Sequence, residues 1–288
     1  MTAHPLAPLL VASPFLGQYL LVQPGHAAGV RIPEVRYEEL RGATANDQRG
    51  DDDPMKHILN APGRLTDRGR QFLAARARAV PFPRQENPDD TEVMARLARF
   101  PEVDSTMALA RLRQAQDRYG GLVYPTSAWS FQEEIRFEPW PYYEVSANHG
   151  PLAEFIDHEV AHPYSVTLRS DGAVVYRFAA DVTVFADADA LIEADALYWE
   201  CENWTPVIEP KARQSTAGVR EAASRLPLIR EGSGNTEWWW ESDGFRVHLW
   251  RTFAELFQQE GQAGWGLWAR DEAGLQAAHR FLAANDLR

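Results

Sequence analysis

Cysteine and lysine are scarce in this sequence, which has one cysteine and two lysines among 288 residues. The single thiol, Cys201, cannot form a disulfide within the chain and cannot build a zinc site from several thiolates. We expect it to be unreactive as well, because the carboxylates of Glu200 and Glu202 raise the pKa of a neighbouring thiol and disfavour the thiolate. Cysteine chemistry is therefore not expected of this protein.

Long hydrophobic runs are also missing, since no stretch approaches the roughly 18 apolar residues of a membrane-spanning helix. The apolar segment at residues 6–21 contains Pro8 and Pro14, and no lysine or arginine precedes it as in a secretory signal. We expect a soluble, cytoplasmic protein that does not bind membranes.

Positive charge is in deficit, with 41 acidic against 29 basic residues and a net charge of −12. A field of this sign repels the phosphate backbone, so we expect no nucleic-acid binding. A DNA-binding regulator acting through the N-terminal unit is for this reason a remote alternative. The same field suits a basic protein partner, although acidity that serves only solubility is common.

The order of the elements predicts an α+β fold. With 45% hydrophobic residues the chain can bury a large core. Helical patterns, then short strands, then a helix indicate a meandering antiparallel sheet flanked by helices, and they exclude a doubly wound parallel fold. We predict three parts: a small N-terminal strand and helix unit at residues 1–84, an α+β core at 85–210, and a C-terminal hairpin and helix unit at 211–288.

In the N-terminal unit we predict paired strands at residues 19–22 and 30–32, and a helix capped by Thr66. In the core, two helices at 91–100 and 105–119 precede the strands, and Gly120 or Gly121 ends the second with a positive φ. The predicted strands are residues 121–124, 135–137, 142–145, 165–168, 173–178 and 182–185, followed by a helix over 187–199.

The C-terminal unit follows a connector predicted at residues 206–218. It begins with a hairpin that turns at Ser242-Asp243-Gly244, and helices at 253–259 and 274–284 flank a strand at 264–268. An earlier hairpin turns at Ser170-Asp171-Gly172 and also leads into a strand and an alanine-rich helix. The two segments, each a hairpin followed by a strand and a helix, therefore indicate a duplicated unit as one interpretation.

Residues 158–162 spell H-E-x-x-H, the pattern in which a zinc hydrolase holds its metal with two histidines and activates water with the glutamate. On a helix whose apolar stripe is Leu152, Ile156 and Val160, both His158 and His162 lie on another face. Pro163 opposes this interpretation, because the residue before a proline is driven out of helical geometry.

A third zinc ligand is not marked by the sequence, which offers Glu193, Glu200 or Glu202 without preference. We therefore expect no metal and no cofactor. The alternative is zinc held by His158, His162 and Glu193, with Glu159 as the catalytic base.

Tryptophans gather at two places, Trp199 with Trp204 and the run Trp238, Trp239 and Trp240. Alternation along a strand puts Trp238 and Trp240 on one face and Trp239 on the other. Tryptophan is enriched among the residues that dominate binding energies, so all five are candidate partner-binding residues, with packing beneath a helix as the alternative.

Part of the core resembles a known family. Residues 111–124 form an amphipathic helix that runs through Tyr119-Gly120-Gly121 into a strand, and the run 165–172 leads through strands to a closing helix at 190–198. This layout, over residues 105–200, resembles the SUKH superfamily, whose members are largely bacterial immunity proteins encoded beside toxins. The resemblance implies a protein that acts by binding.

We therefore predict a non-catalytic, immunity-like neutraliser of a partner toxin or enzyme. The alternative from another class is a zinc-dependent hydrolase using residues 158–162. No nucleophile elbow, Walker lysine or paired-carboxylate signature points to a different enzyme.

Overall fold

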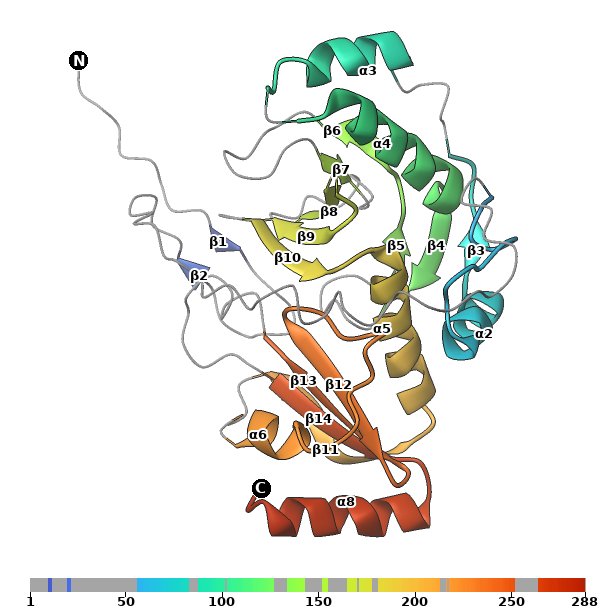
Figure 1. The fold of residues 1–288 in the computed structure, drawn as a ribbon. Helices are drawn as coiled ribbons and strands as arrows, with labels where there is room; N and C mark the ends of the chain where they lie inside the picture. The colour runs from blue at the N-terminus through green and yellow to red at the C-terminus, as the bar shows by residue number, and fades with distance from the viewer. Residues whose placement is uncertain are drawn as a thin grey trace, which may run out of the picture.

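The computed structural model describes residues 10–11, 20–21, 56–82, 88–101, 103–126, 134–142, 152–154, 165–169, 171–177, 181–212, 216, 218–251 and 264–287. Within these ranges the chain is an α+β protein of helices and antiparallel sheets, which confirms the predicted fold class (Figure 1). None of the helices described there is long and apolar enough to cross a membrane.

The structure describes parts of the predicted N-terminal unit. β1, Leu10–Val11, pairs with β2, Leu20–Leu21, whereas the expected partner at residues 30–32 lies outside the described residues. Helix α2, Asp67–Arg76, begins as predicted, because the Thr66 hydroxyl accepts a hydrogen bond from the N–H of Gly69 at 3.3 Å.

A three-stranded sheet joins this region to the core. β3, Arg78–Ala79, pairs with β4, Leu122–Pro125, which pairs in turn with β5, Glu134–Arg136. The strand that follows α2 therefore shares a sheet with two strands of the core.

Both helices predicted at the start of the core are confirmed. α3, Asp90–Leu97, and α4, Ser105–Tyr119, each begin at an aspartate whose carboxylate accepts a backbone N–H, and the two helices pack on each other. Their buried faces contribute Val93, Leu97, Ala108, Leu112 and Ala115 to the main hydrophobic core.

The core holds a five-stranded meander in the order β10-β9-β8-β7-β6. Its strands are β6 Trp140–Tyr142, β7 Leu152–Glu154, β8 Ser165–Arg169, β9 Val174–Arg177 and β10 Asp181–Phe185. β7 corrects the helix expected to start at Leu152. Pairing of Ala153 with Pro141 and Leu168 places this segment within the sheet, so tertiary pairing overrides an apolar spacing that also fits a helix.

The C-terminal sheet has four strands in the order β11-β14-β13-β12. They are β11 Thr205–Ala212, β12 Glu237–Ser242, β13 Phe245–Trp250 and β14 Gly264–Ala269, so the predicted hairpin and the strand after it are confirmed. The expected helix at 253–259 lies outside the described residues.

β11 corrects the connector predicted at residues 206–218. Pro206 and Pro210 argue against a strand in the sequence, yet β11 lies at the edge of its sheet, where a proline can sit without losing a bond to a neighbour. The register also shifts twice along its pairing with β14.

The described helices that pack on the C-terminal sheet are α5 Ala188–Cys201, α6 Val219–Ala223 and α8 Glu272–Ala284. α6 and α8 cover one face of the C-terminal sheet, where Trp240, Val247 and Trp265 meet Ala222 and Ala278. α5 packs on the opposite face through Leu197 and Cys201, which contact Trp239 and Trp268. The C-terminal sheet is therefore covered on both faces (Figure 1).

The two hairpins lead into similarly capped helices. Asp187 at the start of α5 accepts the N–H of Ala190 at 2.9 Å, and Asp271 at the start of α8 accepts that of Gly274 at 2.8 Å. This likeness agrees with the expected duplication, which stays a prediction.

Gly121, and not Gly120, takes the positive φ expected after α4. Its φ is +78°, and a Cβ there would lie 2.1 Å from the carbonyl oxygen of Val80. Gly172 has a φ of +93° with nothing within 4 Å of such a Cβ.

We predict that Gly121→Ala lowers the free energy of unfolding by at least about 1 kcal/mol more than Gly172→Ala, since both add backbone strain but only the first adds a clash. Urea unfolding measures both, and equal losses would contradict the close approach.

Candidate functional site

Helix α5 is buried over most of its length and carries four acidic side chains in contact with other elements. Buried carboxylates are costly unless hydrogen bonds or cations compensate them. Each of the four, Asp189, Glu193, Asp195 and Glu200, has such a partner outside α5. This polar contact set is the candidate functional site.

Glu193 links α5 to the start of α2. One carboxylate oxygen accepts the backbone N–H of Thr66 at 2.6 Å, and the other accepts the Thr66 hydroxyl at 2.8 Å and lies 3.4 Å from Arg68. Burial raises the pKa of Glu193, while these hydrogen bonds and Arg68 act in the opposite direction. Gly69 provides the space, because a Cβ there would lie 2.5 Å from the carboxylate.

Asp189 and Asp195 of α5 contact residues of α4 and of the segment after β4. Asp189 accepts the hydroxyl of Tyr119 at 2.7 Å and pairs with Arg118 at 3.1 Å, which joins α5 to the end of α4. Asp195 accepts the hydroxyl of Thr126 at 2.7 Å, just after β4. Burial, and then the charge of Asp189, raises the pKa of Tyr119, so this hydroxyl stays protonated and donates.

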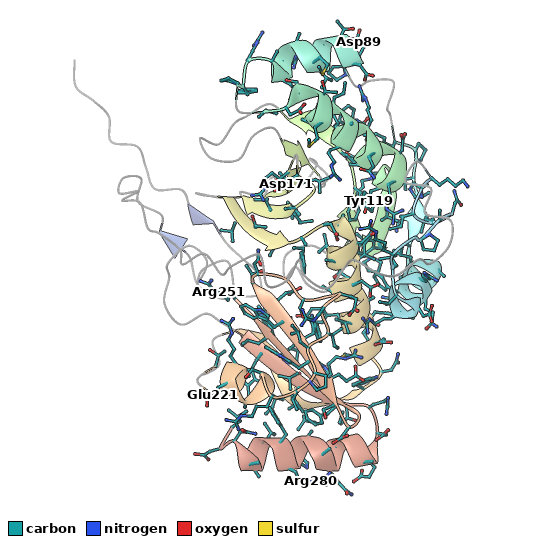
Figure 2. All side chains as sticks on the ribbon, in the orientation of Figure 1. Asp89, Tyr119, Asp171, Glu221, Arg251 and Arg280 are labelled. Carbon is teal, nitrogen blue, oxygen red and sulfur yellow. The ribbon has the colours of Figure 1, made fainter. Side chains whose placement is uncertain are left out.

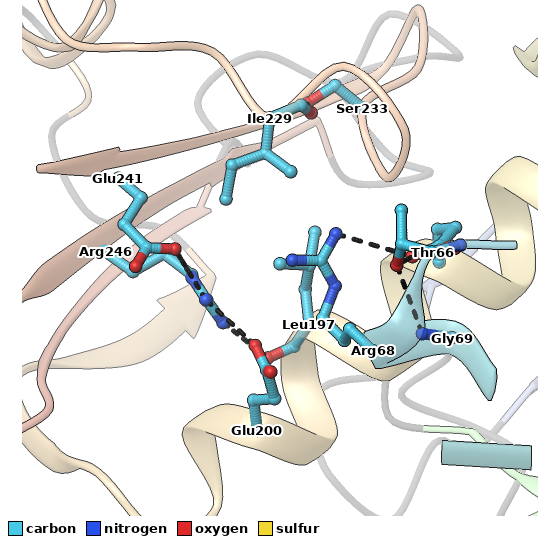
Figure 3. Close-up of polar contacts among 10 residues, drawn as sticks. Thr66, Arg68, Gly69, Leu197, Glu200, Ile229, Ser233, Glu241 and Arg246 are labelled. Atoms are coloured by element: carbon cyan, nitrogen blue, oxygen red, sulfur yellow. Dashed lines mark hydrogen bonds and ion pairs between the residues drawn. The ribbon is translucent and has the colours of Figure 1, made fainter. Parts of the chain in front are cut away.

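Glu200 meets the C-terminal sheet through Arg246 of β13. The buried guanidinium lies 2.9 Å from Glu200 and 2.6 Å from Glu241 of β12, and Figure 3 shows it extended between them. It also lies over the ring of Trp204 at 4.5 Å. A buried arginine with two carboxylates and an aromatic face fixes the end of α5 to the sheet.

Cys201 lies against this arginine, with its sulfur 3.6 Å from the guanidinium. Burial raises the pKa of the thiol to about 12 although Arg246 lowers it, and Glu200 and Glu241 add smaller upward effects. The expected direction of the shift is confirmed, but burial and not the adjacent carboxylates is its main cause. The thiol is a core group.

A second polar chain crosses from α5 to the sheet. The hydroxyl of Tyr198 lies 2.8 Å from Nδ1 of His248, and Nε2 of His248 lies 3.3 Å from a carboxylate oxygen of Glu237. Hydroxyl, imidazole and carboxylate follow one another as in a catalytic relay. His248 is 0% and Glu237 6% exposed, so no substrate reaches this chain in the described conformation.

The five candidate tryptophans divide into two groups. Trp239 and Trp240 are 0% and 4% exposed, which corrects their assignment to a partner surface, because one packs under α5 and the other under α6 and α8. Trp238, Trp199 and Trp204 are half-buried. Arg220 lies over the ring of Trp238 at 4.4 Å, as Arg246 lies over that of Trp204, so these three tryptophans stay candidate partner-binding residues.

The H-E-x-x-H run at residues 158–162 lies outside the described residues, and so does Pro163. Glu193, the third ligand of the zinc alternative, does not fit that role, because both of its oxygens are engaged by Thr66. Glu200 and Glu202 pair with Arg246 and Arg76. Among the residues that the structure describes, no three His, Cys, Asp or Glu side chains are grouped so as to hold a metal ion.

Comparison with family models, with curated proteins and with solved structures finds no match to this chain. The SUKH resemblance is therefore untested and stays an expectation. The polar contacts described above have no counterpart in the sequence-based prediction, which singled out neither Arg246 nor His248. The sequence feature that points to these contacts is the presence of several acidic residues in the otherwise apolar helix α5.

Gly69 offers a test of the Glu193 contact. Alanine normally stabilises a helix interior by about 0.5–1 kcal/mol over glycine. We predict that Gly69→Ala instead destabilises by about 1–3 kcal/mol, because its methyl group displaces the Glu193 carboxylate. Urea unfolding gives the measurement. In a Glu193→Ala background the added methyl group should cost nothing, and an undiminished cost there would refute the link.

Proposed function

We propose that this chain is a non-catalytic binding protein, an immunity-like neutraliser that occludes a partner toxin or enzyme in the cytoplasm. The proposal rests on where the chain keeps its reactive groups and on the surface at the end of α5. The SUKH resemblance of residues 105–200 points the same way.

Three described side chains of types often used in catalysis are buried, and this supports a binding role. Glu193, Cys201 and His248 are buried and contact other groups of the fold. Each therefore contributes to the packing of α5, and none is presented to a substrate in the described conformation. Burial moves the pKa of Cys201 to about 12 and that of His248 well below its ordinary value, so both groups are neutral near pH 7.

The observation that carries the proposal is the set of partly exposed residues where α5 ends, which we call the α5-end surface and define as Trp199, Glu200, Glu202, Trp204 and Glu241. Glu200, Trp204 and Glu241 meet at Arg246, while Trp199 and Glu202 contact Phe72 and Arg76 of α2. Its two tryptophans are half-buried, and the side chains of Glu200, Glu202 and Glu241 are 32%, 45% and 32% exposed.

These residues are held in place by the fold. Trp199 packs on Phe72 of α2 at 5.8 Å, and Trp204 lies against Arg246, which orients two of the carboxylates. Arg246 and Arg76 pair with the three carboxylates, so the surface keeps one net negative charge beside two fixed aromatic rings. Such a surface suits a basic protein, since charge speeds encounter and buried rings supply affinity. The net charge of −12 favours the same partner.

The zinc hydrolase remains the alternative, through His158, Glu159 and His162. Glu193 does not fit as its third ligand, because both carboxylate oxygens are engaged by Thr66.

The test begins with capture of the partner from the source cell, followed by binding kinetics with the purified pair. We expect a basic partner whose association slows as salt rises. Glu202→Lys on the α5-end surface should slow association several-fold, because it replaces attraction by repulsion. Trp204→Ala should mainly hasten dissociation and cost about 2 kcal/mol or more.

The matched control is Glu221→Lys on α6, whose side chain is 81% exposed on the other face of the C-terminal sheet (Figure 2). It makes the same charge change and should leave binding unaltered. Equal effects of the two lysine variants would reject the α5-end surface. Stoichiometric zinc lost in His158→Ala, with hydrolysis lost in Glu159→Gln, would favour the enzyme instead.

A further inference from the structure

The chain of Tyr198, His248 and Glu237 has no evident part in the proposed binding surface, yet it bridges α5, β13 and β12. The ring of His248 is stacked between Trp239 and Trp250, with centroid distances of 3.9 Å and 4.8 Å. Because the ring cannot turn without moving these tryptophans, its two nitrogens are fixed on the hydroxyl at one end and the carboxylate at the other.

The hydrogen bonds of this chain can form with Glu237 either protonated or ionised, so the cost of burying its charge decides which state is stable. Each ring nitrogen has one polar partner, so a neutral ring donates to one and accepts from the other. The second oxygen of Glu237 is buried and has no hydrogen-bond partner among the described residues, and neither has the indole nitrogen of Trp239. An ionised Glu237 would leave a negative charge with one compensating contact, which is costly in a buried place.

The charged groups around the chain do not supply that compensation. On α5, Asp195 and Cys201 lie close enough to act on Tyr198, and both raise its pKa after the larger effects of burial and of Glu237. On β13 the nearest cation is Arg246, two residues from His248, which is held by Glu200 and Glu241. β14 contributes the uncharged ring of Trp268.

We propose that this chain is a proton-linked latch, which holds the C-terminal sheet against α5 while the buried Glu237 carboxyl keeps its proton and releases the sheet when Glu237 ionises. Release uncovers the apolar cluster of Leu197, Cys201, Trp239 and Trp268. The latch is argued without the binding role proposed above, but release would also separate Arg246 of the sheet from Glu200 at the α5-end surface.

The pKa values give the direction of the effect. Burial raises the pKa of Glu237 from 4.5 to about 8, so its contribution to stability is complete below pH 4.5 and is lost as the pH rises through about 8. Burial lowers the pKa of His248 well below 6.5, so its contribution is present above pH 6.5 and is lost at lower pH. The two effects oppose each other between pH 4.5 and 6.5, and above that window the loss from Glu237 remains.

Cys201 provides the readout, because it is the only cysteine of the chain and lies within the cluster that the latch covers. The rate at which a thiol reagent labels Cys201 is measured from pH 6.5 to 9 and divided by the rate for the urea-unfolded chain at the same pH. This ratio removes the ionisation of an exposed thiol and reports opening alone.

We expect the ratio to rise with pH, by at most tenfold per unit for one proton, and to level off above about pH 8, in the wild type and in Glu221→Gln. Glu221 of α6 is 81% exposed and lies on the other face of the C-terminal sheet, so it is the matched control. In Glu237→Gln the ratio should be independent of pH, because an amide cannot lose the proton. A flat wild-type ratio, or an unchanged slope in Glu237→Gln, would overturn the latch.

Infrared spectra of the wild type keep the proposal testable even where a variant fails to fold. A protonated carboxyl should be visible at pH 7 and should vanish above about pH 8, where the labelling ratio levels off. Its absence at pH 7 would mean that Glu237 is already ionised beside His248, and the latch would be rejected.

Discussion

The burial of acidic side chains along α5 is the constraint on which the rest of the structure depends. A buried or partly buried carboxylate requires donors at fixed places, and the donors for Glu193, Asp189 and Glu200 come from different elements. Thr66 precedes α2, Tyr119 ends α4 and Arg246 belongs to β13. Helix α5 therefore determines where two helices and the C-terminal sheet can lie. Gly69 and Gly232 permit this, since a Cβ at either position would overlap side chains of α5.

This arrangement also explains how the chain divides its chemistry. Among the described residues, Glu193, Cys201 and His248 are buried, and the groups on the α5-end surface are carboxylates and two tryptophan rings held by other parts of the fold. A rigid acidic surface of this kind loses little conformational entropy when a basic partner binds. The binding proposal and the stability of α5 are in this sense two consequences of the same contacts.

Local signals in the sequence predicted much of the fold. Thr66 marks the start of α2, and Ser242-Asp243-Gly244 predicts the turn between β12 and β13, where Asp243 and Gly244 both have positive φ. Prediction failed where tertiary contacts decide. The prolines of β11 fit an edge position that no local pattern reveals, and alternation along β12 could not show that both of its faces are covered. The partners of the acids in α5 lie up to 127 residues away, beyond any spacing rule.

Native-state hydrogen exchange across α5 tests the central claim most directly. If the buried carboxylates make α5 the element on which the others depend, its central amides should exchange only through global unfolding, with the free energy that urea denaturation gives. The amides of α2 should open at lower free energy, since α2 depends on α5. Exchange of the α5 amides through a partial opening, while α2 and α4 remain protected, would contradict the account.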